Sequence, residues 1–300
     1  MGTQAQPLDA RWKSGGIMKA SRLVPLARTP LPATVRIDLS MRLPVRQLFY
    51  LIASGLMAVS ALLSCRVVAA DTLSVAVAAN VQYAFSELQS SFEKHNVHRL
   101  QPIFGSSGKL VTQITLGAPF DVFLSADTAY PAALQQAGFT AAAPVVYARG
   151  ALVLWTLKPI DLSRWQAILA SAAVRRIALP NPEVAPYGRE ALRAIAAAGL
   201  TARLQPKLVI AEGVSQANQY IHSQAVDAGF TARSVVQSQA MRGVGNWVAI
   251  SADLYQPIAQ AMVTTTHGAR LHAQAAQQFS AFLLSPAGRE ILARNGYLAP

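Results

Sequence analysis

FGSSGKLVTQITLGAPFDVFLSAD, residues 104–127, is the stretch from which the fold can be predicted. Residues 105–108 form a turn of glycine and serine between an apolar strand end and a run with helical spacing, and residues 122–124 form a second short apolar strand. The first amides of a helix have no partner within it, and the aligned peptide dipoles place about half a positive charge there. The turn therefore predicts an anion site, with the hydroxyls of Ser106 and Ser107 as further donors.

The rest of residues 71–300 continues this alternation of strand and helix. The pattern predicts strands at residues 73–78, 151–155, 177–179, 208–210 and 226–232, and helices near residues 81–92, 128–137, 187–195, 214–221, 272–284 and 286–294. Such alternation favours parallel sheets with helices on both faces.

Residues 242–265 interrupt the alternation with a longer extended stretch. We therefore expect an α/β fold of two lobes, each a mainly parallel sheet flanked by helices, joined by two hinge crossings. Lobe I would comprise residues 71–150 and, after the hinge return, 246–300. Lobe II would comprise residues 151–245.

Ligands of open α/β sheets bind outside the carboxyl ends of the strands. Four such strand ends carry small or polar residues: Ala79-Asn80, Ser106-Ser107, Pro186-Tyr187 and Gly213-Val214. If the two lobes face each other, these four tips meet in one cleft. The serines also suit helix capping, so capping and anion binding both remain open for Ser106.

The first 70 residues carry +7 of the formal net charge of +12, from nine lysines and arginines against two acidic residues. A short basic region after Met41, an apolar run over residues 48–63 and the ending Val68-Ala69-Ala70 predict a signal peptide at residues 41–70 and export to the periplasm. Residues 1–40 are interpreted as a non-native or disordered extension upstream of the true start. Lipid anchoring through Cys65 is the alternative to cleavage after Ala70.

The remaining charge of residues 71–300 is spread singly, which argues against a nucleic-acid partner. Cys65 is the only cysteine, so the exported chain would contain no disulfide. The five histidines show no metal-ligand spacing, and no nucleophile and base pattern indicates an enzyme or a cofactor. Asp121 and Asp127 lie at opposite ends of one strand, about 20 Å apart, which predicts capping and hinge pairing rather than shared acid and base chemistry.

Five segments together resemble the periplasmic molybdate-binding proteins of ABC importers. They are VAVAANVQYAFSEL, FGSSGKLVTQITLGAPFDVFLSAD, ALPNPEVAPYGREAL, AEGVSQA and AGFTA, in this order across residues 71–300. The resemblance implies a two-lobed type II periplasmic binding protein fold that closes over a tetrahedral oxyanion. It also implies a membrane permease as partner, a monomeric chain and no cofactor.

By the same resemblance, the oxyanion contacts fall on Asn80 with the amide region of Ala79, on Ser107, on Tyr187 and on the backbone N–H of Val214. One branch of the family has a tyrosine where Ala232 stands here. This chain resembles the other branch, in which the tyrosine hydroxyl comes from the turn that contains Tyr187.

Molybdate is a fully ionised tetrahedral dianion, so a site with donors alone suits it. Phosphate keeps a proton at neutral pH and would leave that donor unpaired in a closed cleft. Sulfate is also free of protons, and its exclusion depends on size; tungstate is nearly isosteric with molybdate. The expectation is a molybdate carrier that also takes tungstate, with a carrier of sulfate or another oxyanion as the alternative. An exported enzyme and a regulatory effector domain are the competing classes.

Overall fold

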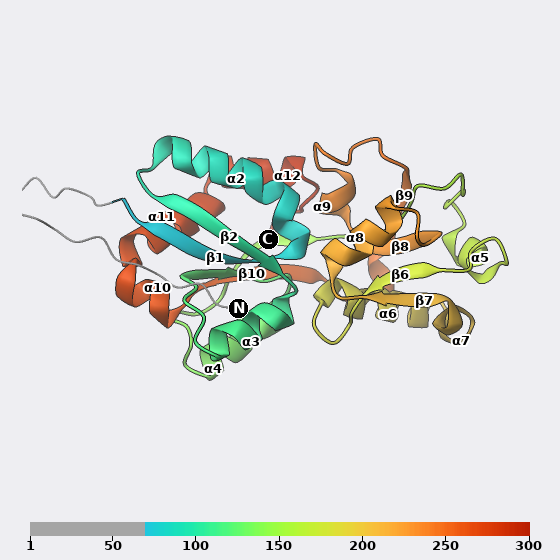
Figure 1. Cartoon of the computed structure of the whole chain (residues 1–300), viewed down its shortest axis with the longest axis horizontal. Helices are drawn as coiled ribbons and strands as arrows, with labels where there is room; N and C mark the ends of the chain where they lie inside the picture. The colour runs from blue at the N-terminus through green and yellow to red at the C-terminus, as the bar shows by residue number, and fades with distance from the viewer. Residues whose placement is uncertain (1–69) are drawn as a thin grey trace, which may run out of the picture. The chain divides into compact units, whose positions relative to one another are not determined.

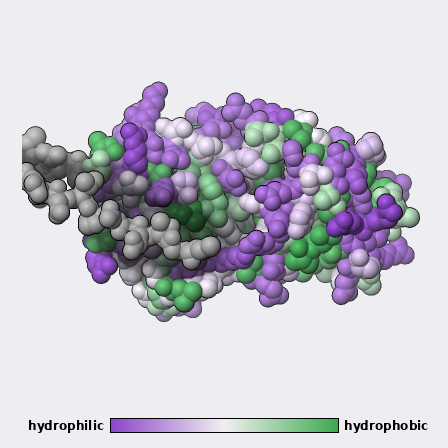
Figure 2. All heavy atoms as spheres, viewed as in Figure 1, coloured by the Kyte–Doolittle hydropathy of each residue, from purple (hydrophilic) through white to green (hydrophobic). Residues whose placement is uncertain are grey.

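The computed structural model describes residues 70–300 (Figure 1). The interpretations of residues 1–40 and of nearly all of the signal peptide therefore lie outside the described residues. Within the described part of the chain, every helix is too short or too polar to cross a membrane. On the face shown in Figure 2, hydrophilic side chains are spread over the surface rather than gathered in one patch.

The first lobe is built on a five-stranded sheet. Its order is β2 (Arg99–Gly105), β1 (Thr72–Ala78), β3 (Val122–Leu124), β10 (Ile258–Thr264) and β4 (Val145–Gly150). β1 pairs in parallel with β2 and β3, whereas β10 is antiparallel to both β3 and β4. Four strands therefore run in one direction, and β10, which returns through the hinge, runs in the opposite one, so the sheet is mainly parallel with one reversed strand.

Helices cover both faces of this sheet because its strands alternate between two apolar cores. In β1, Leu73, Val75 and Val77 belong to one core and Ala76 to the other. The first core is closed by α2 (Gln82–His95), α11 (Ala273–Leu284) and α12 (Pro286–Arg294). The second core is closed by α3 (Ser107–Thr115) and α4 (Ala129–Gln136). Figure 1 shows α2 and α12 on one side of the sheet and α3 and α4 on the other.

The second lobe repeats the design. Its sheet has the order β7 (Leu208–Ala211), β6 (Ile177–Pro180), β8 (Ala228–Ala232), β5 (Leu152–Thr156) and β9 (Asn246–Ala249). β6 pairs in parallel with β7 and β8, and β5 is antiparallel to β8 and β9. The longer helices of this lobe are α6 (Pro186–Ala197) and α8 (Val214–His222), and the shorter ones are α5 (Trp165–Ala170), α7 (Thr201–Leu204) and α9 (Arg233–Val236).

The chain crosses between the lobes twice, as expected. The first crossing is the short link from β4 to β5, and the second runs from β9 to β10. Because β9 pairs with β5, it belongs to the sheet of lobe II. The expected boundary between residues 245 and 246 therefore lies one strand too early, and the hinge return begins after Ala249.

Asp227 ties the ends of three strands of lobe II together. Its carboxylate accepts bonds from Lys158 Nζ at 2.5 Å and from the backbone N–H groups of Arg175 and Arg176 at 2.7 and 2.9 Å. Burial alone would raise the pKa of this carboxyl, but these bonds outweigh it and lower the pKa from 3.8 to about 2. The charged form is thus favoured by the folded state.

We expect Asp227→Asn to lower the free energy of unfolding at neutral pH by roughly 1–3 kcal/mol. Since the folded pKa is depressed, this stability is present above the unfolded pKa near 3.8 and is lost as the pH falls toward about 2. Urea unfolding curves at several pH values measure it: the difference from wild type should shrink through this range. Glu183→Gln, at an exposed carboxylate in the loop before α6, is the control. A difference that persists unchanged in acid would contradict the linkage.

Candidate functional site

The four predicted tips converge between the lobes, and all are buried. Ala79 and Asn80 lie in the short helix η1 (Ala79–Val81), and Ser106 and Ser107 lie at the start of α3; both belong to lobe I. Tyr187 and Val214 lie at the starts of α6 and α8 in lobe II. None of the six residues is more than 8% exposed: Ala79, Asn80, Ser106, Ser107, Tyr187 and Val214. Ala79, Tyr187 and Val214 share one apolar cluster.

Ser107 is the first residue of α3 and keeps a free hydroxyl hydrogen. Its Oγ accepts the backbone N–H of Ala126 at 3.0 Å, which fixes the side chain against the end of β3. A hydroxyl has one hydrogen and two lone pairs. Since the recorded bond uses a lone pair, the hydrogen remains available to a ligand.

Ser106 is placed differently from its neighbour. It occupies the N-cap position of α3 but makes no side-chain capping bond. Its Oγ donates instead to the backbone carbonyl of Glu212 in the other lobe, at 3.1 Å. Its hydrogen is therefore committed to a bond between the lobes.

Asn80 turns its side chain away from the tips. Its Nδ2 donates to Gln260 Oε1 and to the Tyr297 hydroxyl, each at 2.9 Å. Both hydrogens of this side-chain NH₂ group are therefore used inside the protein. The backbone N–H of Asn80, in the first turn of η1, remains as a donor.

Tyr187 is fully buried at the start of α6, and its hydroxyl accepts a bond from Gln260 Nε2 at 3.2 Å. Burial, and then the nearby phenols of Tyr297, Tyr147 and Tyr255, raise the pKa of Tyr187 well above its ordinary value, against a smaller opposite effect of Gln260. The group is thus a neutral phenol at physiological pH. Its own hydrogen is not used by the recorded bond.

Val214 begins α8, so its backbone N–H has no acceptor within the helix. The preceding residue must be small, because a Cβ at Gly213 would lie 2.4 Å from Ser106 Oγ. The turns before α3 and α8 therefore touch across the lobes. Ala232, where one family branch has tyrosine, is buried in β8 and pairs with Leu152.

A hollow of about 320 Å³ opens beside these turns and is lined from both lobes. Ala79, Ser106 and Lys109 line it from lobe I, and Glu212 and Gly213 from lobe II. Asn80, Ser107, Tyr187 and Val214 do not line this hollow, so it lies beside the predicted donors rather than around them.

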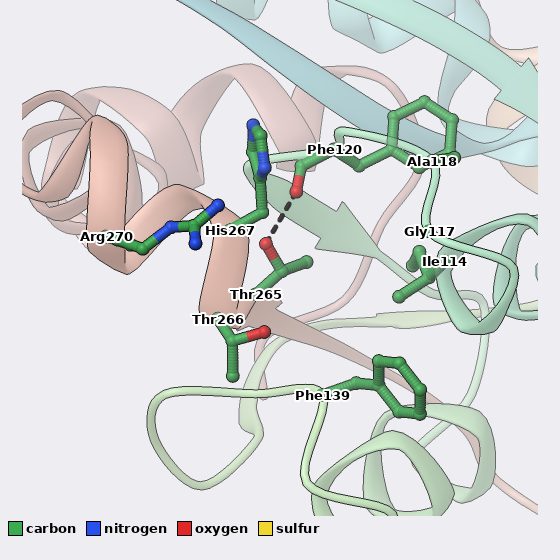
Figure 3. A pocket seen from close by; sticks show the side chains of 9 residues that line it. All are labelled: Ile114, Gly117, Ala118, Phe120, Phe139, Thr265, Thr266, His267 and Arg270. Atoms are coloured by element: carbon green, nitrogen blue, oxygen red, sulfur yellow. Dashed lines mark hydrogen bonds between the residues drawn. The ribbon is translucent and has the colours of Figure 1, made fainter.

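A second hollow, of about 290 Å³, lies within lobe I and contains none of the predicted residues (Figure 3). Its wall includes His267, which lies beside a cluster that sequence reasoning missed. Buried Asp121 lies 2.9 Å from His272 Nδ1 and 3.8 Å from His267 Nε2, and it accepts the N–H of Ser74. Across the described residues, no three side chains of histidine, cysteine, aspartate or glutamate are arranged to hold a metal ion.

Charged side chains pair across the lobes around the site. Lys109 pairs with Glu212, and Arg189 pairs with Asp127. Asp127 also caps α4 by accepting the N–H of Tyr130, so its predicted roles in capping and hinge pairing are both present. The Tyr130 hydroxyl donates to the Glu183 carbonyl, and its ring lies 5.2 Å from the Arg189 guanidinium. The candidate donors themselves are neutral.

Two α/β lobes with neutral donors converging from helix starts define a binding protein for a small solute. The chain belongs to the family of bacterial extracellular solute-binding proteins, whose model matches residues 73–298. It is therefore a binding component located outside the cytoplasm and not an enzyme. The expected α/β two-lobed class is confirmed.

Similar proteins carry more specific names. The chain is 37% identical to the molybdate-binding protein ModA of Azotobacter vinelandii, over 79% of this chain and 93% of that protein. It is 35% identical to ModA of Rhodobacter capsulatus, over 77% of this chain and 89% of that protein. The solved structure of the Azotobacter vinelandii periplasmic molybdate-binding protein aligns with a TM-score of 0.72 at 34% identity, covering 76% of this chain and 99% of that one.

The two ion pairs between the lobes should contribute unequally to solute binding. The side chains of Arg189 and Asp127 are 32% and 15% exposed, whereas those of Lys109 and Glu212 are 46% and 62% exposed. Solvent screens the second pair more strongly. We expect Arg189→Met to lower solute affinity on the order of tenfold and the matched variant Lys109→Met by less than about threefold.

Titration calorimetry of both variants, after circular dichroism has shown that they fold, measures this difference. Equal losses would mean that the ion pair of Arg189 does not favour the closed arrangement of the lobes.

Proposed function

We propose that this chain captures molybdate outside the cytoplasm for an ABC importer. The observation that carries the proposal is that the hydroxyls of Ser107 and Tyr187 each accept one bond from the protein and keep their only hydrogen. Relatives that cover most of this chain are named molybdate-binding proteins, which supports the same ligand.

The anion would be held by donors from both lobes. Ser107 Oγ and the backbone N–H groups of Ala79 and Asn80 act from lobe I, and Tyr187 Oη and the N–H of Val214 act from lobe II. Ser106 would instead contribute to closure through its bond to lobe II. Bonds of this kind to a charged group contribute roughly 1.5–3 kcal/mol each, so a few of them suffice for tight capture.

A site with donors alone selects by protonation state. Molybdate has no proton to donate, whereas phosphate at neutral pH would bring a donor that meets no acceptor in the closed cleft. Tungstate, nearly isosteric with molybdate, should bind as well. A carrier of sulfate or another tetrahedral oxyanion is the alternative, because sulfate also lacks protons and only the spacing of the donors excludes it.

The remaining assignments follow from this function. The protein would work as a monomer in the periplasm and deliver its ligand to the membrane permease subunits of an ABC importer. Molybdenum would be bound as molybdate, with no cofactor and no protein atom bound to the metal.

Calorimetry of the exported chain against molybdate, tungstate, sulfate and phosphate tests the proposal. We expect similar affinities for molybdate and tungstate, much weaker binding of sulfate and no measurable binding of phosphate. Ser107→Ala should weaken molybdate binding about tenfold to a hundredfold. Ser106→Ala is the matched control and should lose less, because its hydroxyl is bonded to Glu212. Preference for sulfate would establish the alternative.

The N-terminus of the exported chain should be Asp71. The sequence ending Val68-Ala69-Ala70 supports cleavage at this point. Asp71 itself is bonded to lobe I, since its N donates to His98 Nδ1 at 3.1 Å and its carbonyl accepts from the N–H of Arg99 at 2.9 Å. Mass spectrometry of periplasmic protein measures the terminus, and a lipid-modified Cys65 would refute this cleavage.

A further inference from the structure

A network of buried side chains lies behind the candidate site and joins both lobes. Its members are at most 4% exposed: Asn80, Tyr147, Tyr187, Gln260 and Tyr297. Tyr187 comes from lobe II, and the others belong to lobe I. Gln260, in the returning strand β10, lies between the rest.

The orientation of the side-chain amides follows from the backbone carbonyl of Asn80, which can only accept and takes a hydrogen bond from Ser234 Oγ at 2.9 Å as well as one from Tyr297. Tyr297 donates its hydroxyl hydrogen to this carbonyl at 2.9 Å. A hydroxyl has a single hydrogen, so toward the Asn80 side chain, also at 2.9 Å, the Tyr297 oxygen can only accept. With the Tyr297 hydrogen on this carbonyl, the Asn80 side chain turns its NH₂ group toward Tyr297.

The orientation of Asn80 determines that of Gln260. The Asn80 NH₂ group lies 2.9 Å from Gln260 Oε1, and the reverse orientation of Gln260 would oppose two NH₂ groups in a buried place. Tyr147 donates to the same oxygen at 3.1 Å. Gln260 Nε2 is then left to donate to the Tyr187 hydroxyl at 3.2 Å.

We propose that Gln260 is a positioning residue that makes the Tyr187 hydroxyl a donor toward the bound anion. The inference rests on the proposed function, which places this hydroxyl among the ligand contacts. Because Gln260 Nε2 occupies one lone pair of the hydroxyl, the hydrogen of Tyr187 points away from Gln260 and is left for the bound anion. Selection against an anion that carries a proton thus depends on a residue that does not touch the anion.

The first crossing encloses this bond. A Cβ at Gly150 would lie 2.0 Å from the Tyr187 hydroxyl and 2.7 Å from Gln260 Nε2, so only glycine allows the backbone to pass here. Gln260 itself follows the second crossing by a few residues. The bond from Gln260 Nε2 to the Tyr187 hydroxyl therefore has backbone on one side and buried side chains on the other. Its orientation is set by the protein rather than by solvent.

Gln260→Glu tests the proposal, because it keeps the size of the side chain and replaces its NH₂ group with an oxygen that accepts. Tyr187 would then donate to residue 260 and turn a lone pair toward molybdate. We expect a greater loss of molybdate affinity than the roughly tenfold to hundredfold loss for Tyr187→Phe, which only removes a donor.

A double-mutant cycle separates this reversal from the effect of added charge. Charge alone would weaken binding equally with and without the Tyr187 hydroxyl. The proposal expects the loss caused by Gln260→Glu to be at least about tenfold smaller in the Tyr187→Phe background than in wild type. Tyr147→Phe is the matched control background, since Tyr147 also bonds to Gln260; there the loss should remain full.

Calorimetry with molybdate measures the affinity lost through Gln260→Glu in wild type, in Tyr187→Phe and in Tyr147→Phe. Equal losses in these three backgrounds would overturn the proposal. Wild type that binds no molybdate would instead refute the proposed function. If circular dichroism shows that Gln260→Glu does not fold, Gln260→Met enters the same cycle. Gln260→Met should lower molybdate affinity less than Gln260→Glu does, and this loss should disappear in the Tyr187→Phe background. A loss of the same size in both backgrounds would also overturn the proposal.

Discussion

The first backbone amides of a helix need an acceptor outside that helix, and this constraint organises the molecule. In both lobes, parallel strands end at the cleft and lead into helices or helical turns, namely η1, α3 and α8. The apolar cores lie behind these ends and hold the helix starts in place. The helix starts therefore supply backbone donors whatever side chains they carry, and in the proposed site the hydroxyls of Ser107 and Tyr187 complete the set.

The local sequence was sufficient to predict those helices, strands and turns that depend only on neighbouring residues. The strand, turn and helix around Ser107 could be predicted because the change from an apolar strand to helical spacing lies within a dozen residues. The same holds for α12, which was predicted at residues 286–294 and begins directly after Ser285, whose side chain accepts the N–H of Gly288 as N-cap. The four tips could be predicted for this reason: each lies at the start of a helix or helical turn, three close behind a strand and Pro186-Tyr187 after the loop that follows β6.

Features that depend on distant pairing could not be predicted. An extended stretch does not show which sheet it will join, so β9 was assigned to the hinge return although it pairs with β5. Asn80 and Gln260 are 180 residues apart, and Gln260 lies in an apolar strand without a local signal. The direction of the Asn80 side chain, and the use of the Ser106 hydroxyl between the lobes, follow from such contacts alone.

Two ion pairs, Lys109–Glu212 and Arg189–Asp127, join the lobes beside the cleft, and the candidate donors are neutral. A buried cation would attract every small anion and would itself be costly to desolvate. Neutral donors respond instead to where the hydrogens of the ligand are, so they distinguish anions of equal charge. That discrimination requires each donor to keep its direction, which the enclosed bond between Gln260 and Tyr187 provides. Tyr187 belongs to one lobe and Gln260 to the other, so the bond that orients the donor exists only while the lobes are together. Selectivity and closure are therefore properties of the same contacts.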